Sequence, residues 1–325
     1  MRAAQRDGGL DGATVVIAGA SSGIGRATAR AFAAQGARLV LAARRRDMLE
    51  DAAAECRRAG GDAIAVPADV TSPSDMRHLL DAAIDRYGGV DVWINNAGVG
   101  AVGWFEDVPL EAHHRTIETN LLGPLNGAHA VLPHFIDRGR GVLINTSSIG
   151  AWVYPPGAVA YAAAKAGLHG LTEALRHEMR RHSGVHVCAI YPSFVDTPGL
   201  KHAGNYTGRT LDPRGPMQSP ERIARLMVDL AAHPRPRVPV GLPTLLGRVA
   251  YALAPDLVGR AMLAGVEMAL ARATPGRNGS GNLFGPPEDR MAVRGGGQSL
   301  LPLAVGLGAA GLLAAGALAA GRRAA

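Results

Sequence analysis

The sequence predicts an α/β fold built on a doubly wound parallel sheet. Apolar runs alternate with segments of helix length from Ala13 to about Pro192. The runs are apolar on both faces, which is typical of parallel strands that helices cover on each side. Crossovers between parallel strands are almost always right-handed, so the helices fall on both faces of the sheet. Ligands of such sheets bind beyond the carboxyl ends of the strands.

The predicted strands each end in small or polar residues, and they lie at 13–20, 37–44, 62–70, 90–98, 141–148 and 185–193. Helices are expected between them, among others over 47–59, near 107–133 and near 159–182. Ser219 and Pro220 predict a further helix that reaches about Ala232, because serine is a good N-cap and proline is tolerated in the first turn.

The pattern changes after Pro192 and predicts the domain organisation. Residues 196–220 are rich in Gly, Pro, Thr and His and are expected to form a flexible loop that acts as a lid, and 234–239 reads as a linker. Two short amphipathic helices are expected over 243–272, broken at Pro255, before a polar, mobile segment at 273–298. We therefore expect an N-terminal tail at 1–11, a catalytic domain at 12–235, a helical extension with a flexible linker at 236–298, and a membrane-spanning helix at 299–321.

The membrane prediction rests on an uncharged run from Leu300 to Ala320, which Arg322 and Arg323 follow. At about 1.5 Å per residue this run would reach roughly 30 Å, the thickness of the hydrocarbon core of a bilayer. A buried helix is the alternative, since Ala and Gly supply little insertion energy and Leu must supply most of it. We expect membrane association through this helix.

Composition narrows the class of protein. The chain has 325 residues, of which 47% are apolar and 19% charged, so it is globular rather than disordered. The net charge is +7, but aromatic residues make up only 4% and no lysine-rich run occurs, which argues against nucleic-acid binding. Two cysteines and scattered histidines predict neither a disulfide framework nor a metal site. The first dozen residues lack an apolar core, so we expect a cytoplasmic catalytic domain.

A glycine-rich loop follows the first predicted strand and precedes a helix that opens at Arg26. Glycines allow the backbone to turn tightly and to approach a pyrophosphate, and the helix N-terminus offers N–H donors to that anion. The position in the first strand–loop–helix unit makes this a specific signal for a dinucleotide. The residues expected to bind it are Gly19, Ser21, Ser22, Gly23, Ile24 and Gly25.

The end of the second predicted strand indicates which dinucleotide. A site for NAD usually carries an acidic residue here, which accepts hydrogen bonds from the ribose 2′-hydroxyl. This chain instead has Ala43 followed by Arg44, and a guanidinium pairs with a 2′-phosphate. We therefore predict NADP, with NAD less favoured. The alternative is that Arg44 and Arg45 are solvated charges at the start of a helix.

Tyr161 and Lys165 lie four residues apart in a predicted helix, so their side chains share one face. An unperturbed tyrosine has a pKa of about 10, and a nearby ammonium group would lower it towards neutrality. The pair can then exchange a proton with an alcohol or carbonyl oxygen. Ser148, thirteen residues before Tyr161, is placed to hold that oxygen.

With these motifs the chain resembles the classical short-chain dehydrogenases/reductases over roughly residues 12–235. The family motifs occur in the family's order: GASSGIG at 19–25, Asp69-Val70, Asn95 to Gly98, Asn120, Ser148, Tyr161 with Lys165, and Pro192 through Thr197. The resemblance implies a Rossmann-type sheet and an oxidoreductase that interconverts an alcohol and a ketone or aldehyde with a nicotinamide cofactor.

The resemblance also implies roles for single residues. Tyr161 would be the acid/base, Ser148 would steady the substrate oxygen, and Lys165 would bind the nicotinamide ribose and lower the tyrosine pKa. Asn120 would support a proton relay through water, which completes the catalytic set. The cofactor would further be bound by Arg44, Asp69 at the adenine, Val70, Asn96, Ala97, Gly98, Tyr161, Lys165, Pro192, Val195 and Thr197 at the carboxamide.

Two positions depart from the family pattern. Ala18 stands where a threonine usually precedes the glycine loop, and Ser193 follows Pro192 where glycine is usual. Neither belongs to the proton-transfer set, so we expect activity to survive.

The substrate and the assembly are less constrained by the sequence. The apolar helices at 243–272 and the predicted anchor favour a lipophilic alcohol or carbonyl. Family members associate through their two long helices, so a homodimer or homotetramer is expected. Two alternatives stay open: a catalytically vestigial NADP-binding regulatory or scaffold protein, and a reductase of small polar carbonyls that carries an unrelated hydrophobic tail.

Overall fold

A seven-stranded parallel sheet forms the centre of the computed structural model, which describes residues 9–211, 217–286 and 292–295. The strands lie in the order β3-β2-β1-β4-β6-β7-β9. The chain moves outward from β1 to β3 and then returns to the other side of β1 with β4, so the topological switch point lies between β1 and β4. The strand bounds are β1 Thr14–Ala18, β2 Arg38–Ala43, β3 Asp62–Pro67, β4 Val92–Asn95, β6 Gly141–Thr146, β7 Val185–Tyr191 and β9 Arg237–Pro239.

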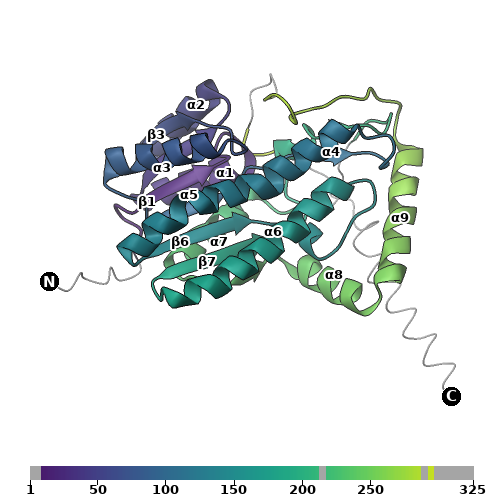
Figure 1. Cartoon of the computed structure of the whole chain (residues 1–325). Coiled ribbons are helices and arrows are strands. Elements are labelled where there is room, and N and C mark those ends of the chain that lie inside the picture. The colour runs from purple at the N-terminus through teal and green to yellow at the C-terminus, as the bar shows by residue number, and fades with distance from the viewer. Residues whose placement is uncertain (1–8, 212–216, 287–291, 296–325) are drawn as a thin grey trace, which may run out of the picture.

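Helices cover both faces of this sheet (Figure 1). Strand residues alternate between the faces: Val15 and Ile17 pack under α1, α2 and α7, whereas Val16 and Trp93 pack under α3 and α5. Both layers are fully buried, as expected of a parallel sheet. The α/β prediction is confirmed. The helix bounds are α1 Gly23–Ala33, α2 Arg46–Arg58, α3 Pro73–Tyr87, α4 Leu110–Ile117, α5 Gly123–Arg138, α6 Val159–Glu178 and α7 Pro220–Ala232.

The start of α7 follows the predicted chemistry. Ser219 is its N-cap and accepts a hydrogen bond from the backbone N–H of Arg222 at 3.3 Å, and Pro220 is the first helical residue. The helix ends at Ala232, as predicted. Ile223 and Met227 then lie on its buried face and carry the helix onto the sheet.

The predicted linker at 234–239 is wrong, because Arg237–Pro239 forms the edge strand β9. It pairs in parallel with β7, and the guanidinium of Arg237 donates to both carboxylate oxygens of Glu173 at 2.7 and 2.5 Å. Prolines on either side hid the strand in the sequence, and an edge strand tolerates them because its outer side forms no ladder bonds. The sheet therefore extends beyond the predicted domain boundary at residue 235.

The segment after β7 contributes one strand to a small second sheet, and the segment after α9 pairs with it through isolated bridges. In the described part of 196–220, β8 (Gly204–Asn205) pairs with β5 (Ala101–Val102). Residues 275 and 279 then form isolated antiparallel bridges with Arg209 and Asn205. The segment 196–220, expected as a flexible loop, and the segment 273–298, expected to be mobile, thus pack against each other over these residues. Each supplies backbone hydrogen-bond partners for the other.

Two helices follow the sheet, as the sequence predicts: α8 (Leu242–Leu253) and α9 (Pro255–Arg272), with the break at Pro255. They stand at one side of the molecule (Figure 1). The leucines of α8 leave much of their surface exposed, up to 78% at Leu253. Within the described ranges, none of the helices has both the length and the apolar character needed to cross a membrane. The predicted membrane helix at 299–321 lies outside the described residues.

Candidate active site

The glycine loop lies at the carboxyl end of β1, beside the switch point of the sheet. Gly19 has a φ of +92°, and a Cβ atom there would stand 2.5 Å from the backbone nitrogen of Ala97. A Cβ at Gly25 would stand only 1.9 Å from the carbonyl oxygen of Gly19. The amide of Asn96 donates to that same carbonyl at 3.0 Å. The loop therefore packs backbone against backbone, which only glycine permits.

The N-terminus of α1 opens directly from this loop. Ser22 precedes the helix without a side-chain capping bond, and Gly23 has a φ of +51°. A Cβ on Gly23 would stand 3.2 Å from the side chain of Thr197, so the segment after β7 borders the loop. Ser21 and Ile24 lie in the same turn and are partly exposed. Glycines, a helix N-terminus and small neighbours are the environment that a pyrophosphate requires, so the loop fits a dinucleotide.

The turn after β4 forms the opposite wall, with Asn96, Ala97 and Gly98 facing the glycine loop or the helix that carries Asn120. Asn95 does not share this role. Its side chain accepts from the indole of Trp93 at 2.9 Å and donates to Asn145 at 2.9 Å inside the sheet. Asn95 therefore contributes to the cofactor site only through the turn that it begins.

A narrow gap, too small to admit a water molecule, lies beside Ala18. It is lined by Ala18, Val70, Asn95, Ala97, Gly123 and Pro124. Val70 follows β3 and packs closely against the start of α5. A Cβ on Gly123 would lie only 2.8 Å from the Val70 side chain.

Arg44, Asp69 and Arg115 form a charged cluster beyond the ends of β2 and β3. Arg115 donates to a carboxylate oxygen of Asp69 at 2.6 Å and to the hydroxyl of Thr71 at 2.8 Å. Burial by itself would raise the pKa of Asp69, but hydrogen bonds from Thr71 and Arg115 hold it below the usual value. The sequence singled out Arg44 and Asp69 but not Arg115, since nothing marks one arginine within a helix.

The side chains of Ser148, Tyr161 and Lys165 converge at the ends of β6 and α6. Ser148 follows β6, and a hydrogen bond links its hydroxyl with that of Tyr161. A Cβ on Gly150 would lie 3.3 Å from the Tyr161 ring and 3.6 Å from the Ser148 hydroxyl, so the glycine leaves room beside both. Lys165 donates from Nζ to the carbonyl of Thr146 at 3.0 Å and lies 5.6 Å from the centre of the Tyr161 ring. The structure thus brings the predicted proton-transfer group together.

Burial dominates the electrostatics of this group. It raises the pKa of Tyr161, and the hydrogen bond with Ser148 only partly offsets this. Burial lowers the pKa of Lys165 to about 8, since the ammonium is removed from water with one carbonyl as its partner. The charge of Lys165, which we expected to lower the pKa of Tyr161, does not outweigh the burial of the phenol.

Asn120 lies in a π-helical turn, Glu118–Leu122, between α4 and α5. Its amide nitrogen donates to the carbonyls of Val99 at 2.7 Å and Thr116 at 2.8 Å. Its side-chain oxygen is buried and has no hydrogen-bond partner among the described residues. Such turns often mark functional sites, and an unpaired buried acceptor is placed to accept a hydrogen bond from a water or a ligand.

The segment after β7 completes the site. The carbonyl of Pro192 accepts from the backbone N–H of Ile149 at 2.8 Å, which fixes the residues that follow Ser148. Val195 is buried and pairs with Gln218, and Thr197 borders the glycine loop. Pro192 and Thr197 thus lie beside the turn after Ser148 and beside the glycine loop, and the binding of the cofactor by Pro192, Val195 and Thr197 stays a prediction.

An aromatic stack stands behind Ser148 on the side of α8. Trp152 stacks on Tyr191 with ring centres 4.0 Å apart, and the guanidinium of Arg248 lies 4.6 Å above Trp152. The hydroxyl of Tyr191 is 2.7 Å from Nδ1 of His169. A Cβ on Gly247 would lie 3.1 Å from Ile149, so α8 packs directly on the turn after Ser148. The contact of Trp152 with Arg248 of α8 has no signal in the sequence, because the two residues lie far apart along the chain.

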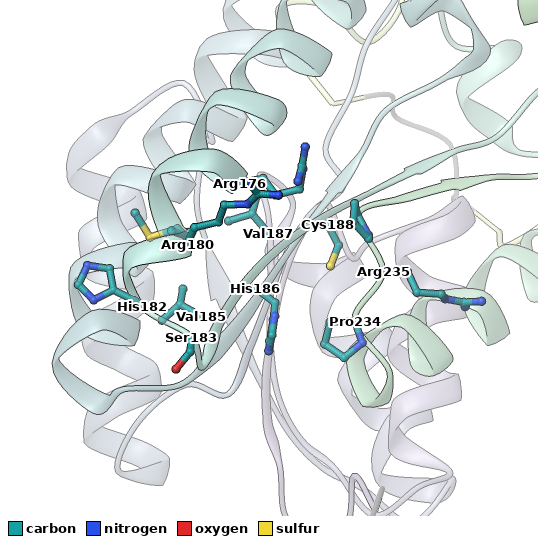
Figure 2. A pocket seen from close by; sticks show the side chains of 12 residues that line it. Arg176, Arg180, His182, Ser183, Val185, His186, Val187, Cys188, Pro234 and Arg235 are labelled. Atoms are coloured by element: carbon teal, nitrogen blue, oxygen red, sulfur yellow. The ribbon is translucent and has the colours of Figure 1, made fainter.

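A cavity of about 280 Å³ lies elsewhere, around the amino-terminal half of β7 (Figure 2). Arg176, Arg180, Arg235 and His186 border it, and none of the predicted site residues does. Arg176 and Arg235 are already paired with acidic side chains. Within the described residues no group of His, Cys, Asp or Glu could hold a metal ion.

Comparison with known proteins agrees with this geometry. Residues 13–206 match the model of the short chain dehydrogenase family. The chain is 37% identical over 254 residues to the uncharacterized oxidoreductase YxnA of Bacillus subtilis, covering 76% of this chain and 70% of that protein. It is 39% identical to the 3beta-hydroxysteroid dehydrogenase 1 of Eggerthella lenta, covering 69% of this chain and 88% of that protein.

A solved structure has the same fold. The crystal structure of a short-chain type dehydrogenase/reductase from Mycobacterium marinum matches with a TM-score of 0.65 and 30% identity, over 72% of this chain and 96% of that one. The family uses NAD(P), for which the glycine cradle and the switch point provide the site. The chain belongs to the short-chain dehydrogenase/reductase family and is an oxidoreductase that acts on CH–OH groups.

Proposed function

We propose that the protein interconverts a lipophilic alcohol and its ketone or aldehyde with NADP(H), and that Tyr161 is the acid/base. The observation that carries the proposal is the hydrogen-bonded pair of Ser148 and Tyr161 beside the buried ammonium of Lys165. When bound, the nicotinamide donates or accepts the hydride.

The chain's own residues handle the proton. In reduction, Tyr161 gives its phenolic proton to the oxygen of the developing alkoxide, and in oxidation it takes that proton back. The raised pKa of Tyr161 keeps the phenol protonated at neutral pH, which suits proton donation. The Ser148 hydroxyl holds the same substrate oxygen, and Lys165 is close enough to stabilise the phenolate. The unpaired oxygen of Asn120 supports a water that returns the proton to the site.

The choice of NADP rests on Arg44. It follows the end of β2, where Ala43 supplies no carboxylate to receive a ribose 2′-hydroxyl. A guanidinium binds a phosphate through charge-assisted, bidentate hydrogen bonds. Arg115 adds positive charge nearby, although Asp69 offsets part of it.

The preference for a lipophilic substrate rests on the walls beside Ser148. Trp152 and Tyr154 border this side, and α8 packs on the same turn with exposed leucines along its length. Apolar surface of this kind favours a ligand that itself leaves water. The similarity to a 3beta-hydroxysteroid dehydrogenase points in the same direction.

We propose, in addition, that the run from Leu300 to Ala320 attaches the protein to a membrane with the catalytic domain in the cytoplasm. The exposed leucines of α8 and α9 would then face the lipid and receive the substrate from it. We also propose a homodimer or homotetramer through α4, α5 and α6. Their exposed apolar side chains include Leu110, Leu122, Leu125 and Val159.

The test of the chemistry compares two tyrosines. Tyr161→Phe should lower kcat by a factor on the order of a hundred or more, the usual contribution of a general acid, and keep NADPH binding. Tyr87→Phe, which removes a hydroxyl at the C-terminal end of α3 and away from the site, should keep most of the activity. If Tyr161→Phe turns over like the unchanged protein, Tyr161 is not the acid/base. Loss of activity without loss of the protein's cellular function would instead favour the scaffold alternative.

The test of the substrate and cofactor is a kinetic series. Ketones and aldehydes of increasing hydrophobicity are assayed with NADPH and with NADH. We expect kcat/KM to rise along the series and to be larger with NADPH. Equal values for small polar and for long apolar carbonyls would contradict the lipophilic proposal. Fractionation of the full chain and of a chain that ends at Gly297 tests the anchor: the full chain should sediment with membranes until detergent is added.

A further inference from the structure

The chain after α9 returns across the molecule to the cofactor half of the sheet. From the end of α9 it runs over α4 towards α2 and α3 (Figure 1). We call residues 275–285 the strap. The strap contains no helix or strand of its own, and its contacts connect three parts of the fold: the segment around β8, the start of α4 and the cluster of Arg44, Asp69 and Arg115.

The strap is held in place by backbone pairing and by one buried side chain. The N–H groups of Gly276, Gly279 and Asn282 donate to the carbonyls of Gly208, Asn205 and His202 at 3.0, 2.8 and 2.8 Å. Leu283 is completely buried in a cluster with Val99, Ala101, Val108 and Ala112. The next residue, Phe284, is 54% exposed. Leu283 is therefore the apolar anchor of the strap, and Phe284 contributes little to its position.

The carbonyls of the strap converge on Arg44. Its guanidinium donates to the carbonyl oxygens of Asn282 at 2.8 Å, Leu283 at 3.4 Å and Gly285 at 3.5 Å. Arg115 donates to the same carbonyl of Leu283 at 3.1 Å. The guanidinium proposed above to bind a ribose 2′-phosphate is thus already surrounded by acceptors from the chain's own backbone.

A phosphate cannot share Arg44 with these carbonyls. A guanidinium has five N–H donors in one plane, and a bidentate phosphate takes two of them on one edge. The strap carbonyls already take both terminal nitrogens. Carbonyl oxygens carry partial negative charge, so a phosphate brought against them would also be repelled. A 2′-hydroxyl neither needs Arg44 nor carries a charge, so it does not require the strap to move.

We propose that the strap is a further determinant of cofactor selectivity: docking of the strap through Leu283 and binding of a ribose 2′-phosphate by Arg44 exclude each other. The inference rests on the proposed preference for NADP. With the strap docked, the site distinguishes only weakly between a ribose that carries a 2′-phosphate and one that does not. With the strap released, Arg44 is free to bind the 2′-phosphate. Because the strap also pairs with the segment around β8, binding of the phosphate at one end of the site loosens the segment at the other.

The experiment uses two probes that differ only in the phosphate at issue, 2′,5′-ADP and 5′-AMP, on the full chain. Hydrogen exchange of the strap amides is measured first, because it needs no variant. We expect 2′,5′-ADP to speed the exchange of Gly276, Gly279 and Asn282, and 5′-AMP to leave it unchanged. Unchanged exchange at saturating 2′,5′-ADP would overturn the proposal and leave the proposed NADP preference intact.

Binding constants of a matched pair of variants give the second measurement. Leu283→Ala removes the anchor, and Phe284→Ala removes an exposed neighbour of similar size. If about one tenth of the molecules have the strap released, Leu283→Ala should raise the affinity for 2′,5′-ADP relative to 5′-AMP by up to roughly 10-fold. Phe284→Ala should keep the ratio of the unchanged chain. Both probes carry a 5′-phosphate, so the ratio of their affinities cancels any change at the 5′-phosphate subsite. Such a change would arise at the start of α1, where the N–H of Gly23 donates to the carbonyl of Ala292 at 3.1 Å.

The outcomes separate the two proposals. An equal ratio in all three proteins, with 2′,5′-ADP bound more tightly than 5′-AMP, refutes the strap but retains Arg44 as a phosphate site. If 2′,5′-ADP binds no more tightly than 5′-AMP even in Leu283→Ala, both the strap proposal and the NADP preference are wrong. Oxidoreductase activity with NADH would still be measurable in that case, so the enzymatic function is judged separately.

Discussion

Substitution of alanine for two helical glycines provides a direct test of the cofactor cradle. Gly25 lies in the first turn of α1, and Gly170 lies on the exposed face of α6. The intrinsic preference for alanine in a helix is the same for both, about 1 kcal/mol. The two sites differ only in what the new methyl group meets: nothing within 4 Å at Gly170, and the carbonyl oxygen of Gly19 at 1.9 Å at Gly25. The pair therefore separates helix propensity from the packing of the loop.

Gly170→Ala should raise Tm by about 2–4 °C, the shift that 1 kcal/mol produces in a domain of this size class. In Gly25→Ala the methyl group would lie 1.9 Å from the backbone carbonyl oxygen of Gly19, and real Cβ contacts are essentially never shorter than 3.0 Å. No side-chain rotation can relieve the clash, because the nearest atom belongs to the backbone. Overpacking of this kind costs about 1–3 kcal/mol, so Tm should fall or stay level.

Gly25→Ala should also displace the loop from a pyrophosphate. We expect NADPH binding, measured by the change in its fluorescence, to weaken by about tenfold or more, which corresponds to 1.4 kcal/mol of that strain. Gly170→Ala should bind NADPH as the unchanged chain does. The same gain in Tm for both variants, or unchanged NADPH affinity in Gly25→Ala, would refute the close approach of the loop to α1 and its role as a cradle.

Three further predictions follow from the pKa shifts of Lys165, Glu173 and the two cysteines. Burial lowers the pKa of Lys165 from 10.5 to about 8. The buried ammonium therefore destabilises the folded state fully below pH 8, and this cost disappears as the pH rises towards 10. In urea titrations, Lys165→Met should be more stable than the unchanged chain below pH 8, and the difference should shrink between pH 8 and 10. The hydrogen bond from Arg237 lowers the pKa of Glu173 to about 2, so the pair stabilises the fold above pH 4.5 and this stabilisation is lost as the pH falls towards 2. In acid unfolding followed by circular dichroism, Glu173→Gln should make stability depend less on pH between 4.5 and 2. The same dependence in both proteins would argue against the pair. Burial raises the pKa of Cys56 to about 12 and of Cys188 to about 11, so iodoacetamide at pH 8 should label neither until the protein is unfolded, as mass spectrometry would report.

The glycine loop and the convergence of Ser148, Tyr161 and Lys165 could be predicted because local geometry determines them. A strand, a loop of glycines and a helix N-terminus are consecutive in the sequence, and the carboxyl ends of parallel strands meet at one edge. Tyr161 and Lys165 share a helix face by spacing alone. Ser148 needed only the end of its strand to be placed correctly.

The electrostatic state of that group could not be predicted in the same way. The spacing of Tyr161 and Lys165 indicates that an ammonium is near a phenol, but the depth of burial sets the balance between the two pKa values. The unpaired oxygen of Asn120 likewise depends on a π-helical turn, in which one extra residue per turn redirects the side chain. Neither apolar periodicity nor motif spacing marks such a turn.

The alternation of apolar runs and helices by itself determined the parallel sheet, the order of its strands along the chain and the edge at which the site lies. Each of these follows from neighbours along the chain. Only the tertiary structure decided that 237–239 is a strand and that 275–285 lies over the cluster of Arg44 and Arg115. Both segments are short, polar or rich in Pro and Gly, and they obtain their conformation from partners far away in the sequence. The free energy that places them comes from backbone acceptors and from one buried leucine, neither of which has a local signature.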